Sequence, residues 1–171
     1  NYRYQLLGGQ GNRTWVAPRL SVNLPVGSEP AGRGSGAFGV TVALPVSVEV
    51  TPSLTGHFNL SGSILSAASH RLPGTTTADA LVGASVIWAV EPRINLMVES
   101  AWTRSRAVTA PGREAWSSST VVSPAVRWAF NYPSGLQIVP AIGYAFDLTT
   151  HGEQNQLLLY LSFEHPFGRS R

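Results

Sequence analysis

The stretch from Phe38 to Val50, FGVTVALPVSVEV, places large apolar residues at every even position and small or polar residues at every odd position. A period of two is typical of a β-strand with one apolar face and one polar face. Seven further stretches repeat this pattern, separated by clusters of glycine, proline and serine that favour turns and loops. The sequence therefore predicts an all-β protein of eight strands.

The predicted strands cover residues 14–26, 38–50, 56–65, 79–90, 93–103, 120–131, 136–147 and 155–167. Long connections follow the first, third and fifth strands, the longest being 104–119, and short connections follow the second, fourth and sixth. Outer-membrane barrels alternate tight periplasmic turns with longer outer loops in this way. We therefore expect an eight-stranded, antiparallel, up-and-down transmembrane β-barrel with both termini in the periplasm.

The expected domain limits follow from these strands. Residues 1–12 form a periplasmic lead-in interrupted by glycines, residues 13–167 form the barrel, and residues 168–171 form a C-terminal tail. The chain begins at Asn1, which fits a mature protein whose signal peptide has been removed and equally a piece of a longer barrel.

A soluble eight-stranded barrel shows the same alternation with the two faces exchanged. Here the polar face is rich in glycine, alanine and serine, whereas a face in contact with water carries lysine and glutamate. Small residues suit the narrow interior of eight strands, and bulky apolar residues suit lipid. Aromatic residues also gather near the predicted strand ends, as in the two interfacial girdles of membrane barrels. We therefore expect the apolar face to point outward, into lipid.

Composition supports this class of protein. Charged residues make up 12% of the chain, about half of the roughly 25% that is usual in soluble domains. No apolar run approaches the roughly 18 residues of a spanning helix. The chain has no cysteine, which excludes disulfides and thiolate metal sites. Its net charge of +3 is not clustered, so we expect no nucleic-acid partner.

Four prolines, at positions 18, 45, 124 and 140, fall inside predicted strands. Because proline has no backbone N–H to donate, we expect bulges or weakened pairing at these positions.

Two stretches carry a resemblance to known proteins. The ending LLLYLSFEHPF resembles the C-terminal strand of bacterial outer-membrane proteins, which alternates apolar residues and closes on an aromatic residue, here Phe167. In this chain Gly168 to Arg171 follow that aromatic residue, which departs from the pattern. The resemblance implies recognition by the barrel-assembly machinery. The stretch VRWAFNYPSGLQIVPAIGYAF is similar to barrels that take up aromatic compounds.

Charged residues on the predicted polar face are the candidate lumen network: Arg13, Arg19, Glu49, Glu91, Glu99, Arg127 and Glu164. They would either form a gated path or fill the lumen as a plug of salt bridges, in which each buried charge needs a partner. We expect the plug, because eight strands leave no aqueous channel.

Arginines in the predicted outer loops are candidate contacts to lipopolysaccharide phosphates: Arg33, Arg71, Arg104, Arg106 and Arg113. Arginine binds phosphate well through its planar fork of donors. The same loops hold acidic residues at positions 29, 79, 114 and 153, so ordinary solvation of the loops is the alternative interpretation.

Residues for catalysis or metal binding do not converge in the sequence. The four histidines, at 57, 70, 151 and 165, lie more than five residues apart, so we expect no metal site and no cofactor. A Ser–His–acid set is conceivable in the outer loops from Ser117, Ser118 or Ser119 with His70 or His151 and Glu114. No lipase motif accompanies these residues, so we expect no enzyme.

The expected role is structural or interactive: a membrane anchor, a lipopolysaccharide binder or a subunit of an envelope complex. The expected partners are outer-membrane lipid, lipopolysaccharide, the barrel-assembly machinery during insertion and other envelope proteins. The alternative is a small pore, or part of an uptake channel for small or hydrophobic compounds.

Overall fold

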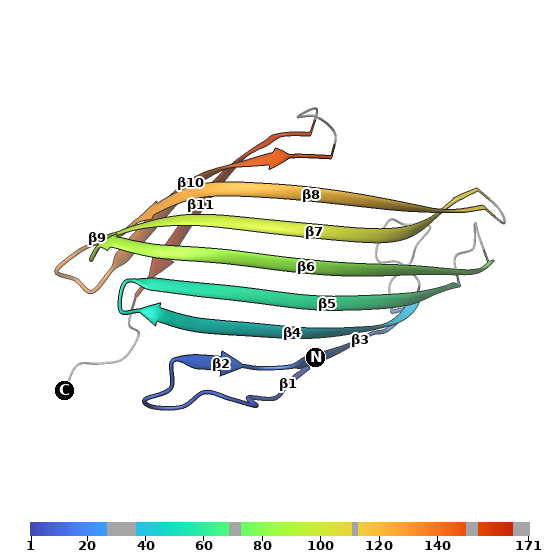
Figure 1. Cartoon of the computed structure of the whole chain (residues 1–171), viewed down its shortest axis with the longest axis horizontal. Helices are drawn as coiled ribbons and strands as arrows, with labels where there is room; N and C mark the ends of the chain where they lie inside the picture. The colour runs from blue at the N-terminus through green and yellow to red at the C-terminus, as the bar shows by residue number, and fades with distance from the viewer. Residues whose placement is uncertain (27–36, 69–72, 111–112, 150–153, 166–171) are drawn as a thin grey trace.

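The computed structural model describes residues 1–26, 37–68, 73–110, 113–149 and 154–165 (Figure 1). The prediction of an all-β fold is confirmed, because every regular element in these ranges is a β-strand. The strands are β1 (Tyr2–Arg3), β2 (Thr14–Val16), β3 (Arg19–Asn23), β4 (Ala37–Thr51), β5 (Leu54–Ala68), β6 (Pro73–Glu91), β7 (Ile94–Ala110), β8 (Arg113–Trp128), β9 (Phe130–Asn131), β10 (Gln137–Asp147) and β11 (Gln156–Glu164). In the part of the chain that is described, no helix has the length and apolar character needed to span a membrane.

All eleven strands belong to one antiparallel sheet with the order β1-β3-β4-β5-β6-β7-β8-β10-β11, in which β2 also pairs with β4 and β9 with β10. The sheet is therefore the predicted up-and-down meander. It differs from the prediction in having eleven strands instead of eight, because the N-terminal segment adds β1 and short interruptions divide two of the predicted strands, and in being open, with β1 and β11 as its two edges. Figure 1 shows the long strands β4 to β8 side by side, with β10 and β11 curling behind β8.

The N-terminal segment occupies one of these edges. Tyr2 pairs with Leu20, and an isolated bridge joins Leu7 to Val16. The predicted lead-in, interrupted by glycines, therefore contains a short strand at Tyr2–Arg3 that the sequence did not predict. Gly8 makes the return possible: its φ is +117°, and a Cβ there would lie 2.2 Å from Trp15 Cδ1. The indole of Trp15 thus packs directly on the bare backbone of Gly8.

The middle strands extend much further than their alternation suggests. β7 continues to Ala110 and β8 begins at Arg113, so most of the predicted loop 104–119 is strand. β6 likewise begins at Pro73 instead of Asp79. These extensions carry polar residues on both faces, which hides the period of two, whereas cross-strand pairs such as Arg106 with Trp116 continue the ladder. The predicted long loops after the third and fifth strands are accordingly much shorter.

The prolines weaken pairing without producing bulges. Pro18 separates β2 from β3, yet both pair with β4 in one constant register. Between β8 and β10, strand pairing is interrupted around Pro124 and again around Pro140, and it resumes each time in the same register. Of the two outcomes expected, weakened pairing is observed. The register shifts within the described strands lie beside the connections instead, for example between Glu49 and Thr51.

The two faces of the sheet differ sharply. We call the side that carries Ser47, His57 and Ser123 the inner face, and the side that carries Val46 and Phe58 the outer face. All strongly buried residues that are described belong to the inner face or continue it: Ala17, Ala37, Gly39, Ser123, Val139, Gly143, Ala145 and Asp147. No large side chain in the described ranges is fully buried. Most of the large, exposed apolar side chains of the long strands lie instead on the outer face.

Candidate functional site

The residues of the predicted lumen network largely share the inner face. Register places Arg19, Glu49, Glu99, Arg127 and Glu164 on it, contributed by β3, β4, β7, β8 and β11. The two others stand at strand ends. Arg13 precedes β2 and accepts a hydrogen bond from the Glu49 backbone N–H through its carbonyl oxygen, and Glu91 lies at the turn from β6 to β7.

Arg127 is the centre of this group. With the Asn95 amide turned so that its oxygen faces the guanidinium, Arg127 Nη2 donates to that oxygen over 2.6 Å. One pocket of about 310 Å³ brings Arg127 together with Glu164 and Tyr160. A second pocket of about 310 Å³ brings Arg127 together with Glu99 and Tyr160. The inner face therefore holds a cation between two carboxylates, beside an aromatic ring.

These opposite charges are near one another without touching. Within the described ranges, no ion pair joins any two of the seven predicted lumen residues. Glu99 and Glu164 are both exposed. In the open sheet the side chains face water, so they need no buried partner. The predicted plug of salt bridges stays a prediction about a closed lumen.

His57 lies on the inner face, as predicted, and contacts Ser47. Ser47 Oγ is 2.8 Å from His57 Nδ1, across the pair β4–β5. A pocket of about 240 Å³ adds Glu99, Ser85 and Ser123. A catalytic histidine is oriented by a third group, but no carboxylate of the described residues hydrogen-bonds to His57. We read the Ser47–His57 pair as a structural contact between strands.

Two acidic residues of the inner face do not appear in the predicted network. Asp79 is the first residue of the predicted strand 79–90 and is also counted with the outer-loop charges; it lies well inside β6, where its carboxylate accepts a hydrogen bond from Ser63 Oγ over 3.2 Å. Asp147 ends β10, is 7% exposed, and accepts a hydrogen bond from the Thr149 backbone N–H over 2.7 Å. The odd numbering of both residues within their strands is the signal that would have placed them.

The second candidate site lies on the outer face, at the end of the sheet where β7 and β8 are joined. Arg104 and Arg106 were predicted in a loop but lie in β7, and Trp116 pairs with Arg106 from β8. Arg104 Cζ is 5.1 Å and Arg106 Cζ 6.0 Å from the centroid of the Trp116 ring. Both distances fall within the range of a cation–π contact. Sequence reasoning found the arginines and missed the tryptophan between them.

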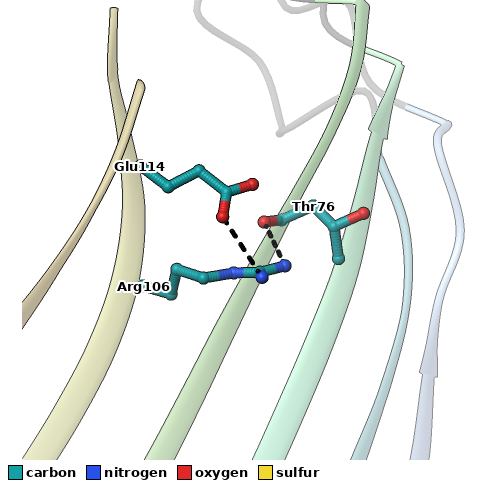
Figure 2. Close-up of polar contacts among 3 residues, drawn as sticks. All are labelled: Thr76, Arg106 and Glu114. Carbon is teal, nitrogen blue, oxygen red and sulfur yellow. Dashed lines mark hydrogen bonds and ion pairs between the residues drawn. The ribbon is translucent and has the colours of Figure 1, made fainter. Parts of the chain in front are cut away.

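Arg106 is held in place by two further contacts, drawn in Figure 2. Its Nη1 lies 3.2 Å from Glu114 Oε2, and its Nη2 donates to the Thr76 carbonyl oxygen over 3.0 Å. Its Nε is buried without a hydrogen-bond partner. Arg104, in contrast, is exposed, and its guanidinium makes no hydrogen bond or ion pair with the described residues. One arginine is therefore fixed and the other is available.

The remaining predicted residues are spread out. Arg113 is exposed at the start of β8, and Arg33 and Arg71 lie outside the described residues. The histidines of the suggested catalytic set, His70 and His151, also lie outside them. Ser117 and Ser119 face inward while Ser118 faces outward, because they alternate along β8. Within the described ranges, no three His, Cys, Asp or Glu side chains cluster closely enough to hold a metal ion.

Comparison with known proteins gives no guide to this geometry: no protein-family model, no curated protein and no solved structure matches the chain. The functional argument therefore rests on the two faces of the sheet and on the residues they carry.

Proposed function

We propose that this chain forms the wall of an outer-membrane β-barrel with a structural or interactive role. One observation carries the proposal: the outer face exposes large apolar side chains along every long strand. Examples from four strands are Val42 at 57%, Ile64 at 60%, Val86 at 49% and Val98 at 52% exposed. An apolar surface of this extent marks a contact with another apolar phase. Lipid is the phase that accepts it on a sheet whose other face is polar.

Strand length supports the same role. A tilted transmembrane strand needs about 9–11 residues. β10 has 11 residues and β11 has 9, while β4 to β8 have between 15 and 19. The shorter strands thus suffice to cross, and the longer ones project beyond the membrane at the end where β7 joins β8. Trp88 on β6 and Trp102 on β7, both exposed on the outer face, fit the two interfacial levels.

The register also supports a tilted wall. One outer-face row passes through Val46, Phe58 and Ala84 and continues through Ser100, Val122 and Phe146. Val46 lies nearer the end of the sheet where β4 turns into β5. Phe146 lies at the other end of the sheet, next to Asp147, the last residue of β10. The strands are therefore staggered, and a barrel of tilted strands requires such a stagger.

Closure of the barrel is part of the proposal, and the strand directions restrict it. Neighbours along the sheet alternate in direction, so β1 and β11, at the two ends of a nine-strand path, run the same way. Joining them would give a parallel pair. Joining β11 to β3 would give an antiparallel pair and an even strand count, as bacterial barrels have. We propose the second closure, in which the segment Tyr2–Leu7 leaves the edge of β3.

In this proposal the barrel anchors in the outer membrane, contacts lipopolysaccharide or serves as a subunit of an envelope complex, and it has no catalytic site or cofactor. The C-terminal strand would be read by the barrel-assembly machinery during insertion.

The first test is extraction from native outer membranes in mild detergent, followed by particle mass and electrophoresis with and without heating. We expect the protein in the membrane fraction, with a heat-modifiable band. A mass near that of one chain, 18.2 kDa plus detergent, supports a self-contained anchor, and a much larger particle supports a subunit. Recovery of the protein outside the membrane fraction would refute the proposal.

A small pore is the second candidate, and the inner-face pockets around Arg127 favour it. A polar cavity and a more apolar one share Arg127 and Tyr160, and each also holds a carboxylate, an arrangement that suits passage of a small amphipathic compound. Conductance in planar bilayers separates the two roles: a plugged barrel is silent, and a pore conducts. If it conducts, replacing Arg127→Glu should shift its selectivity from anions toward cations.

A further inference from the structure

The cluster of Arg104, Arg106 and Trp116 adjoins an apolar pocket on the outer face. This pocket, of about 370 Å³, is lined by Val40, Val42, Ile64, Ala78, Ala80 and Trp116 among others. Ala78 pairs with Arg106 and Ala80 with Arg104, so the two guanidinium groups stand along one side of the pocket. Trp116 belongs to β8 but lines a pocket over β4 to β6, so its indole reaches across β7.

The polar part of the cluster carries a net positive charge. On the outer face, two arginines accompany one carboxylate, Glu114, which is held by Arg106. Asp79 also lines the pocket, but its register places it on the inner face, where its carboxylate accepts a hydrogen bond from Ser63 Oγ. Among the described residues, Arg104 has no hydrogen-bond or ion-pair partner, and its guanidinium lies over the Trp116 ring. A guanidinium on an aromatic face is suited to a phosphate group, because it offers a planar fork of N–H donors without a competing partner. A singly charged phosphate would neutralise the excess charge.

We infer that this corner of the outer face binds a lipid with an anionic phosphate headgroup. The phosphate lies on Arg104, with Arg106 adding charge, and an acyl chain lies in the pocket beside Trp116. The inference rests on the proposed function, because only a membrane-embedded outer face meets lipid. It adds a defined site: the interfacial end of β6, β7 and β8.

The electrostatic part of this site predicts a measurable lipid preference. An arginine near an anionic membrane surface strengthens binding by about fivefold. Arg104 is the better residue to change, since Arg106 also binds Glu114 and the Thr76 carbonyl and its loss would disturb the strands. Arg104→Gln removes the free cation, and Arg104→Lys keeps the charge but not the fork. Arg3→Gln is the matched control, because it removes an equal charge from the distant strand β1.

The experiment uses the full chain refolded into vesicles of phosphatidylcholine with or without phosphatidic acid. Tryptophan fluorescence is quenched with brominated phosphatidic acid or brominated phosphatidylcholine. Since the chain has five tryptophans, the difference between the wild type and Trp116→Phe isolates the signal at this site. Heat modifiability and protection from protease report insertion independently of lipid preference.

We expect insertion into both vesicles and preferential quenching of Trp116 by the brominated anionic lipid. Arg104→Gln should lower that preference about fivefold, Arg104→Lys should lower it less, and Arg3→Gln should leave it unchanged. Equal quenching by the two lipids, or no effect of Arg104→Gln, would overturn the inference while the proposed function stands. Competition by inorganic phosphate without lipid preference would also overturn it. A chain that enters neither vesicle refutes the proposed function and this site with it.

Discussion

The inner and outer faces of the same strands follow opposite rules. On β6, Ser85 faces inward beside His57 and Glu99, while its neighbour Val86 faces outward and is 49% exposed. Most polar groups and small residues lie on the less accessible face, and most exposed large apolar groups lie on the accessible one. In a soluble protein this arrangement would forfeit most of the hydrophobic stabilisation. The difference supports the proposed role, in which the outer face meets an apolar phase and the inner face meets polar groups.

Exchanging the character of the outer face should have the largest effect. In the proposed barrel Val86→Arg places a charge against lipid, and we expect it to lower the free energy of unfolding by about 2–4 kcal/mol. Ser85→Arg, one residue away, points toward Glu99 and should change stability far less. Urea unfolding in phospholipid vesicles measures both. Equal losses for the two variants would mean that the faces do not differ in their surroundings.

Tight packing on the inner face provides the next comparison. A Cβ at Gly143 would lie 2.9 Å from Ala125 Cβ and 3.2 Å from the Pro124 carbonyl oxygen. Because neither atom belongs to a flexible side chain, we expect Gly143→Ala to cost about 1–3 kcal/mol. A Cβ at Gly56, on the outer face, would meet nothing within 4 Å.

Gly56→Ala is therefore the control, and it should be neutral or slightly stabilising. Thermal or urea unfolding of the two variants, under identical conditions, makes the comparison. A loss at Gly56 as large as that at Gly143 would contradict the assignment of the closely packed face.

The sequence predicted the faces better than the edges of the sheet. The alternation within 38–50 predicted both ends of β4 to within one residue. A large apolar residue at every second position is compatible with only one assignment of the residues to the two faces. The same reasoning failed for 104–119, where Arg104, Arg106 and Trp116 occupy outward positions that apolar residues fill elsewhere. There the strand forms because it pairs with neighbouring strands, and a single sequence does not show that pairing.

The candidate sites show the same division. The position of Glu99 and Arg127 on the inner face follows from parity alone. Arg104 and Trp116 are twelve positions apart in sequence, and their contact depends on the pairing of β7 with β8. It also depends on side-chain rotamers, which the pattern of apolar and polar positions does not specify. The pairing of Tyr2 with Leu20 was not predicted either. It requires the chain to turn back on itself, and this turn depends on the packing of Trp15 against Gly8.

A hydrogen bond on the inner face gives a smaller prediction. Ser47→Ala removes the 2.8 Å contact with His57 Nδ1 and leaves a partly buried imidazole with one fewer partner. We expect a loss of about 0.5–1.5 kcal/mol. Ser66→Ala, an exposed outer-face position in β5, is the control and should change the free energy of unfolding less. Indistinguishable values from urea unfolding would show that the Ser47 contact does not stabilise the sheet.

The smallest effect is expected at the ion pair between Arg106 and Glu114. The Glu114 side chain is 46% exposed, so water and salt screen the pair, and Glu114→Gln should cost only about 0.2–1 kcal/mol. This loss should shrink as salt is added. Lipid preference should change in the opposite direction. Arg106 keeps its bond to the Thr76 carbonyl oxygen, and the cluster loses the carboxylate that offsets its charge. Glu114→Gln should therefore raise the preference of the Trp116 site for anionic lipid while lowering stability slightly. A fall in both quantities would mean that Glu114 orders the cluster, and that its charge has no part in selecting the lipid.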